Sequence, residues 1–289
     1  MAPASLRALL AGLIDYAGLF PPAALPLEEV VRNYGAYRHS PESWALGRLV
    51  VPAVRLLELL DLLPIGEPPW SVTALVGEDV IADARRIASV RGDPRVSVEA
   101  AEARAFTDDE IGAATRALSD VPAVYIELPA YDDPSDLVRA VGEAGARAKI
   151  RTGGMTVEVF PSAAECARFI AACAHHRVAF KATAGLHHPI RGAFPLTYAD
   201  DAPRGVMFGF LNVFFAGALA RGGMEAPALE QVLMEREVAR FDFHDAGAAW
   251  RGHTLSLEDI ADARDAFAIS FGSCSFREPI NDLTQLGLL

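Results

Sequence analysis

Short apolar runs alternate with helix-like segments along the whole chain, and this alternation limits the fold more than any other feature. Each run is rich in apolar or β-branched residues, and a polar turn and a segment with helical apolar spacing follow it. Eight such runs occur, at Leu13–Ala17, Arg48–Ala53, Ser71–Val76, Arg95–Ala100, Ala123–Leu128, Ala146–Thr152, Val178–Ala184 and Val206–Phe214. Successive strand–helix units predict parallel strands joined by right-handed crossovers.

Two architectures satisfy this pattern, a closed barrel and an open doubly wound sheet. No G-x-G-x-x-G motif follows the first run, which weakens a nucleotide-binding open sheet. Eight units favour the barrel, whose chemistry lies at the carboxyl ends of its strands. We therefore predict an α/β fold with a (β/α)8 TIM barrel over residues 1–220. Residues 221–289 would form a C-terminal extension, either a lid or a subunit contact.

Local signals support several element boundaries. Thr107 with Glu110, and Ser162 with Glu165, have the spacing of capping boxes at helix starts. In the extension, residues 241–244 and 250–253 flank a turn and predict a hairpin. Ser256 is the expected cap of the helix that follows.

Composition excludes several classes of protein. The net charge of −12 disfavours nucleic acids and anionic membranes, which need clustered positive charge. The three cysteines form no C-x-x-C pair and do not predict a disulfide framework. With no secretory pattern and no apolar run of membrane-spanning length, we expect a cytoplasmic protein.

Lysine is almost absent, although the chain is rich in arginine. Of the 26 basic residues only Lys149 and Lys181 are lysines, and both lie near the ends of successive predicted strands. Neighbouring parallel strands are about 4.8 Å apart, so inward side chains at matched heights are neighbours. With a period of two, Lys149 shares its face with Arg151, and Lys181 shares its face with Thr183.

Two enclosed amines predict a specific chemistry. Like charge and burial both lower the pKa of a lysine, and a neutral amine can attack a carbonyl to form a Schiff base. The competing interpretation is that each lysine reaches solvent or pairs with a carboxylate.

The segment from Lys149 to Arg191 resembles the 2-deoxyribose-5-phosphate aldolase family of class I aldolases. The shared motifs are Lys149-Ile-Arg-Thr-Gly153 and Phe180-Lys-Ala-Thr-Ala-Gly185, and weaker similarity covers about residues 10–220. The resemblance implies that Lys149 forms the Schiff base, that Lys181 lowers the pKa of Lys149, and that Glu99 acts as acid or base. It also places Asp15 in the first strand and Glu127 in the fifth.

The chain departs from the family at the substrate end of these motifs. Arg151 replaces a small residue, and Leu186-His187-His188-Pro189 replaces a glycine-rich phosphate loop. Arg151, His187 and His188 therefore favour a substrate with a carboxylate or another anionic group, not necessarily a phosphosugar.

Two further polar residues are candidate site residues. Asp15 either hydrogen-bonds an active-site lysine or begins the turn before Gly18. Asn212 lies in an apolar predicted strand, where a buried amide needs partners and could contact substrate.

Three functions remain open from the sequence. The first is a cofactor-free Schiff-base lyase acting on a small carbonyl compound. The second is a metal-dependent hydrolase or isomerase using His187 or His188 with carboxylates, although no H-x-H or H-E-x-x-H motif occurs. The third is a non-catalytic relative that binds a ligand at the barrel mouth. A homo-oligomer is compatible with all three.

Overall fold

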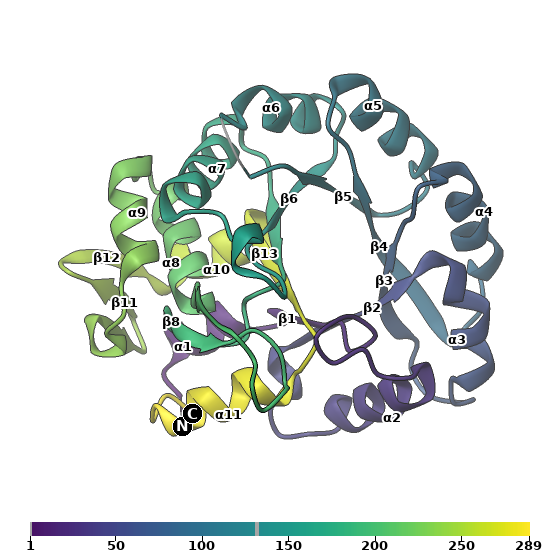
Figure 1. Ribbon diagram of the computed structural model, residues 1–289, viewed down its shortest axis with the longest axis horizontal. Coiled ribbons are helices and arrows are strands. Elements are labelled where there is room, and N and C mark those ends of the chain that lie inside the picture. The colour runs from purple at the N-terminus through teal and green to yellow at the C-terminus, as the bar shows by residue number, and fades with distance from the viewer. Residues whose placement is uncertain (1, 131–132) are drawn as a thin grey trace.

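A closed barrel of eight parallel strands forms the centre of the protein, seen in a computed structural model that describes residues 2–130 and 133–289 (Figure 1). The strands follow the order β1-β13-β7-β6-β5-β4-β3-β2 around the barrel. Their bounds are β1 Ile14–Tyr16, β2 Leu46–Pro52, β3 Trp70–Leu75, β4 Val96–Arg104, β5 Ala123–Leu128, β6 Arg147–Arg151, β7 Phe180–Thr183 and β13 Ala268–Ser273. The predicted (β/α)8 barrel is confirmed.

Helices surround the barrel and separate its successive strands (Figure 1). The α-helices are α1 Ala4–Leu10, α2 Leu27–Arg38, α3 Leu56–Leu62, α4 Val80–Val90, α5 Asp108–Ala117, α6 Ser135–Glu143, α7 Ala163–His176, α8 Phe210–Arg221, α9 Ala226–Met234, α10 Leu257–Ala266 and α11 Arg277–Gln285. The predicted capping boxes are present, with Thr107 at the start of α5 and Ser162 at the start of α7. Within the described residues, no helix is both long and apolar enough to cross a membrane.

The eighth barrel strand is not the one that the sequence indicated. Residues 206–214 divide between β9 (Arg204–Met207), which pairs with β8 (Gly192–Pro195) outside the barrel, and the first turn of α8. Every residue from Phe210 to Ala220 is buried, so α8 is apolar on all sides and lacks the periodicity of a surface helix. A short apolar run of this kind does not distinguish a buried strand from a buried helix.

The strand that closes the barrel lies instead in the predicted extension. β13 pairs in parallel with β1 on one side and with β7 on the other. The division into a barrel at 1–220 and an extension at 221–289 is therefore wrong, because residues 268–273 belong to the barrel.

The rest of the C-terminal region follows the expected pattern more closely. β10 (Phe241–His244) forms a hairpin as predicted, but its partner is β11 (Gly247–Trp250) and not residues 250–253, which instead span the turn to a third antiparallel strand, β12 (His253–Ser256). Ser256 caps α10, as expected.

The interior of the barrel is polar, whereas the main apolar core lies between strands and helices. Barrel interiors are usually filled with branched apolar side chains. Here the interior holds buried charged side chains on β1, β4, β5, β6 and β7. Buried charges are tolerated only when they are paired, so the charged interior of the barrel is a candidate functional site.

Candidate active site

Lys149 and Lys181 lie side by side inside the barrel. They are directly paired in the register of β6 and β7, and their side chains are only 3% and 1% exposed. The predicted adjacency of the two lysines therefore agrees with the structure. Arg151 pairs with Thr183 one step closer to the carboxyl ends of the same strands, on the same face as the lysines.

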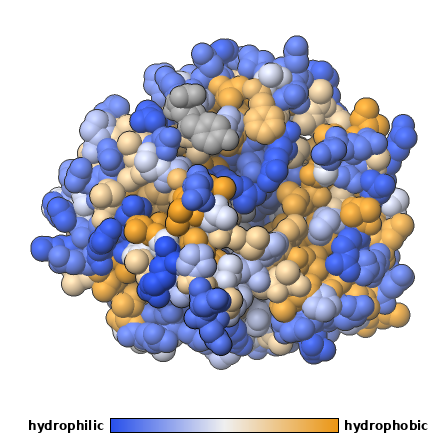
Figure 2. Space-filling model, in the orientation of Figure 1, coloured by the Kyte–Doolittle hydropathy of each residue, from blue (hydrophilic) through white to orange (hydrophobic). Residues whose placement is uncertain are grey.

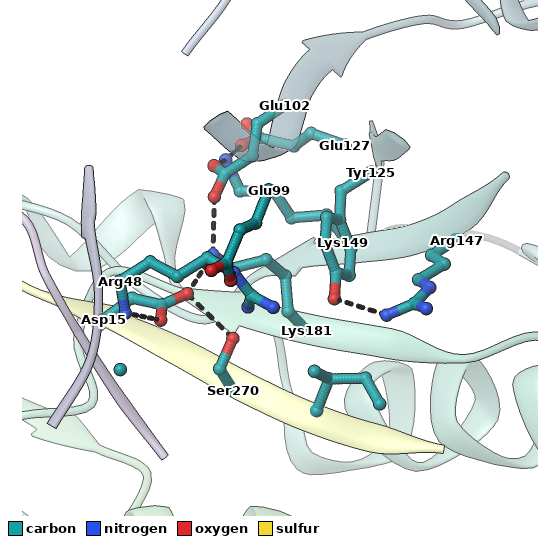
Figure 3. A network of polar contacts seen from close by, with 12 residues as sticks. Asp15, Arg48, Glu99, Glu102, Tyr125, Glu127, Arg147, Lys149, Lys181 and Ser270 are labelled. Carbon is teal, nitrogen blue, oxygen red and sulfur yellow. Dashed lines mark hydrogen bonds and ion pairs between the residues drawn. The ribbon is translucent and has the colours of Figure 1, made fainter. Parts of the chain in front are cut away.

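One carboxylate joins the two amines. Glu102 places Oε1 2.5 Å from the Nζ of Lys181 and Oε2 2.6 Å from the Nζ of Lys149. Figure 3 shows both lysine side chains extending toward this carboxylate from β6 and β7. Glu102 is itself 4% exposed, so the bridge is shielded from water.

Each lysine has a second acidic partner on its outer side. Asp15 Oδ2 lies 2.6 Å from Lys181 Nζ and accepts a hydrogen bond from the hydroxyl of Ser270. Glu127 Oε2 lies 2.8 Å from Lys149 Nζ. Alternating acids and bases thus cross the barrel from β1 to β5.

Asp15 hydrogen-bonds a lysine, which is the first of the two roles considered for it. Its other oxygen, Oδ1, accepts from the backbone amide of Arg48 at 2.8 Å. Gly47 makes this approach feasible, since a Cβ there would lie 2.3 Å from Oδ1.

Glu99 does not contribute the expected contact with the lysines. Its carboxylate pairs with Arg48 at 2.9 Å and accepts from Ser71 at 2.7 Å, near the amino-terminal ends of β2 and β3. The reason is a β-bulge in β4, where the register with β3 shifts between Val98 and Ala100. β4 also continues to Arg104, beyond its predicted end, and this extra length brings Glu102 to the amines.

Two arginines surround Glu127 on the side nearest the barrel mouth. Glu127 Oε1 lies 3.0 Å from Arg104 Nε and 3.3 Å from Arg151 Nε. The two arginine side chains are 62% and 39% exposed, in contrast to the buried lysines. In Figure 2, drawn in the orientation of Figure 1, this face of the barrel carries a hollow lined by hydrophilic residues.

Attraction between opposite charges controls the ionisation of this network. Burial favours the neutral form of Glu102, but the ammonium groups of Lys149 and Lys181 outweigh it and lower its pKa from 4.5 to about 2. Glu127 shifts in the same direction, since Lys149 and Arg151 oppose the effect of burial.

Lys181 remains an ammonium group. Burial acts to lower its pKa, but Asp15 and Glu102 overcome this effect and raise it above the ordinary value. Its Nζ also lies 5.4 Å from the centre of the Tyr125 ring, a favourable position for a cation. From the sequence, crowding of the two lysines was expected to remove the proton from one amine. That expectation did not include the carboxylates that pair with both lysines.

The histidines and Asn212 lie outside this network. His187 pairs with Glu278 and His188 with Asp282, both on α11. Asn212 lies in α8, where its amide accepts from the Arg191 backbone and donates to two backbone carbonyls of residues 232 and 235. The three hydrogen bonds of the Asn212 side chain all join it to backbone groups of other segments, so Asn212 has an architectural role.

Sequence reasoning missed Glu102, Tyr125 and Ser270 as members of the site. Tyr125 could have been identified from its spacing of two residues from Glu127, because this spacing puts both side chains on one face of β5. Glu102 could have been found only by extending β4 and allowing for its bulge. Ser270 depends on β13, which the sequence did not reveal.

Among residues 2–130 and 133–289, no three histidine, cysteine, aspartate or glutamate side chains converge in a way that could hold a metal ion.

The fold and the site together define the protein as a TIM barrel with two buried, ion-paired lysines in its interior. No protein-family model matches the chain, and no curated protein matches it either.

Proposed function

We propose that the protein is a Schiff-base-forming lyase of the class I aldolase type, acting on a small carbonyl compound with an anionic group. The observation that carries the proposal is the pair of adjacent buried amines that share Glu102 inside the barrel. A purely structural ion pair needs one cation and one anion, whereas this network concentrates two amines and three carboxylates at the place where barrel enzymes act.

Lys149 is the better nucleophile of the two. Lys181 is enclosed by Asp15, Glu102 and the Tyr125 ring. Lys149 instead borders Glu127, whose other partners reach the mouth. Lys181 therefore supplies a fixed positive charge, and Lys149 meets the substrate.

The carboxylates supply the proton transfers. Glu127 takes a proton from the Lys149 ammonium group, and the neutral amine attacks the carbonyl carbon to form a carbinolamine. The same carboxyl group returns its proton to the carbinolamine hydroxyl, which leaves as water and gives the iminium ion. A carboxylate then removes the proton of the hydroxyl group on the β-carbon. The carbon–carbon bond breaks as that carbon becomes the carbonyl of the departing fragment, and the electron pair of the bond moves toward the iminium nitrogen and forms an enamine.

The mouth provides the selectivity for charge. Arg151 and Arg104 carry guanidinium groups that are partly exposed and only partly neutralised by Glu127. An anionic group on the substrate would bind them in a bidentate manner, which orients the carbonyl carbon toward Lys149. The resemblance of the two lysine motifs to the deoxyribose-phosphate aldolases supports the reaction type, and these arginines favour the anionic substrate.

Reductive trapping tests the proposal cleanly, because the chain offers only two lysine amines besides its α-amino group. We expect borohydride, added with a panel of small anionic aldehydes and ketones, to fix one substrate mass on the peptide that contains Lys149. Lys149→Met should abolish the adduct. Lys181→Met should still give the adduct on Lys149, but the adduct should form more slowly. Absence of any adduct across the panel, or an adduct on the α-amino group alone, would contradict the proposal and favour a ligand-binding barrel.

A further inference from the structure

A second group of reactive side chains surrounds Cys274. It lies outside the lysine network, which consists of Asp15, Lys181, Glu102, Lys149 and Glu127. Cys274 is the first residue after β13 and lies in the turn that leads into α11. Its thiol is buried.

His187 and Glu278 complete an ordered triad with this thiol. The Sγ of Cys274 lies 4.0 Å from Nε2 of His187, and Nδ1 of the same ring lies 2.9 Å from Oε2 of Glu278. The ring thus has one nitrogen toward the sulfur and the other held by a carboxylate, which is the arrangement of nucleophile, base and orienting acid. Catalytic contacts of this kind are often longer before substrate binds.

Tyr198 covers the triad from the β8–β9 hairpin. Its hydroxyl lies 3.1 Å from Glu278 Oε2 and 3.5 Å from the Cys274 sulfur. Tyr198 as a residue is 57% exposed, so the thiol lies beneath a residue that reaches solvent. A small substrate that displaced this hydroxyl would meet the sulfur.

The electrostatics agree with a thiolate–imidazolium pair. Burial acts against the thiolate, but His187 outweighs it and holds the pKa of Cys274 below the ordinary value. Burial likewise disfavours the imidazolium, yet Cys274 and Glu278 raise the pKa of His187 to about 9. Tyr16 and Tyr198 also interact with the Cys274 thiol, and the pKa values of both are raised, mainly by burial.

We propose that Cys274, His187 and Glu278 form a second catalytic site that transfers the acyl group of a small activated ester or thioester to water. The Cys274 sulfur forms a bond to the acyl carbon while the bond from that carbon to the leaving oxygen or sulfur breaks. His187 gives its proton to the leaving group. It then takes a proton from water, whose oxygen attacks the thioester carbon; the carbon–sulfur bond breaks, the carboxylic acid is released, and the thiolate–imidazolium pair is restored. Glu278 is the positioning residue that holds the imidazole ring.

The test uses p-nitrophenyl acetate with the full chain. We expect a burst of one p-nitrophenolate per chain and one acetyl group on the peptide containing Cys274, released by neutral hydroxylamine as a thioester is. Cys166 and Cys173 are internal controls in the same sample, because burial raises the pKa of both thiols.

Variants separate a catalytic triad from a merely reactive thiol. Cys274→Ala should lose the burst, and His187→Gln should slow acylation by about 100-fold or more. Glu278→Gln should move the pH dependence of acylation toward that of an ordinary thiol, and Glu278→Asp should partly restore it. His175→Gln, a histidine on α7 with no part in the triad, should acylate at the wild-type rate.

Three results would overturn the proposal. They are the absence of a burst, an acetyl group that hydroxylamine does not release because it is on a lysine amine, and a His187→Gln rate equal to the wild-type rate. The outcome is independent of the Schiff-base proposal, since it uses none of the residues of the lysine network.

Discussion

Glu102 is the residue on which the barrel interior most depends. It neutralises two ammonium groups that would otherwise repel one another in a site shielded from water. Removing one partner of a buried ion pair leaves an uncompensated charge, which costs far more free energy than loss of a surface pair. Glu99, three residues earlier in β4, pairs with Arg48 while 37% exposed and so provides a matched comparison.

We expect Glu102→Gln to lower the free energy of unfolding by about 3 kcal/mol or more, as for other broken buried pairs. Glu99→Gln should cost about 1 kcal/mol or less, because its pair is partly solvated. Urea denaturation at pH 7 measures both. Equal effects of the two substitutions would show that Glu102 is not the central carboxylate.

The difference in free energy of unfolding between wild type and Glu102→Gln should also depend on pH. The pKa of Glu102 is lowered from 4.5 to about 2 in the fold, so its stabilisation is complete above pH 4.5 and is lost as the pH falls toward 2. The stability difference between wild type and Glu102→Gln should therefore shrink over that range.

At the scale of elements, irregularity in one strand decides which acid reaches the amines. The bulge near Glu99 and the continuation of β4 to Arg104 together place Glu102 inside the barrel. Helix starts are more regular, because a cap depends on residues only three positions apart. α7, which follows the Lys149 strand, begins with Ser162 accepting from the Glu165 amide, while the Glu165 side chain accepts from the Ser162 amide.

Loss of this cap should be measurable on its own. Ser162→Ala should lower the free energy of unfolding by about 1 kcal/mol, because a backbone amide loses its acceptor. Ser162→Asp keeps an acceptor at the same position and should remain close to wild type. Thermal or urea denaturation compares the three, and an unchanged Ser162→Ala would contradict the role of the cap.

At the scale of the whole molecule, the barrel closes only through the last part of the chain. β13 joins β7 to β1, and Ser270 on β13 hydrogen-bonds Asp15. Arg264 on α10 is buried and donates to backbone carbonyls at both ends of the chain, those of residues 9, 11, 268 and 269. Both the fold and the lysine network therefore require residues beyond 220.

A chain ending at residue 220 should consequently lack a cooperative unfolding transition. It would leave the edges of β1 and β7 unpaired, and apolar strand edges favour aggregation. Circular dichroism with urea titration measures this against the full-length protein, and addition of residues 221–289 should restore some structure. A cooperatively folded monomer of residues 1–220 would refute the expectation.

The amino-acid sequence by itself determined the barrel class, its first seven strands, the capping boxes and the adjacency of Lys149 and Lys181. These features arise from local spacing and from the regular pairing of successive strands, which short-range patterns encode. Only the tertiary structure decided that β13 closes the barrel, that Glu102 replaces Glu99 beside the amines, and that His187 faces Cys274. Each of these depends on a bulge, on burial from all sides or on contacts between residues far apart in the chain, and no local pattern records them.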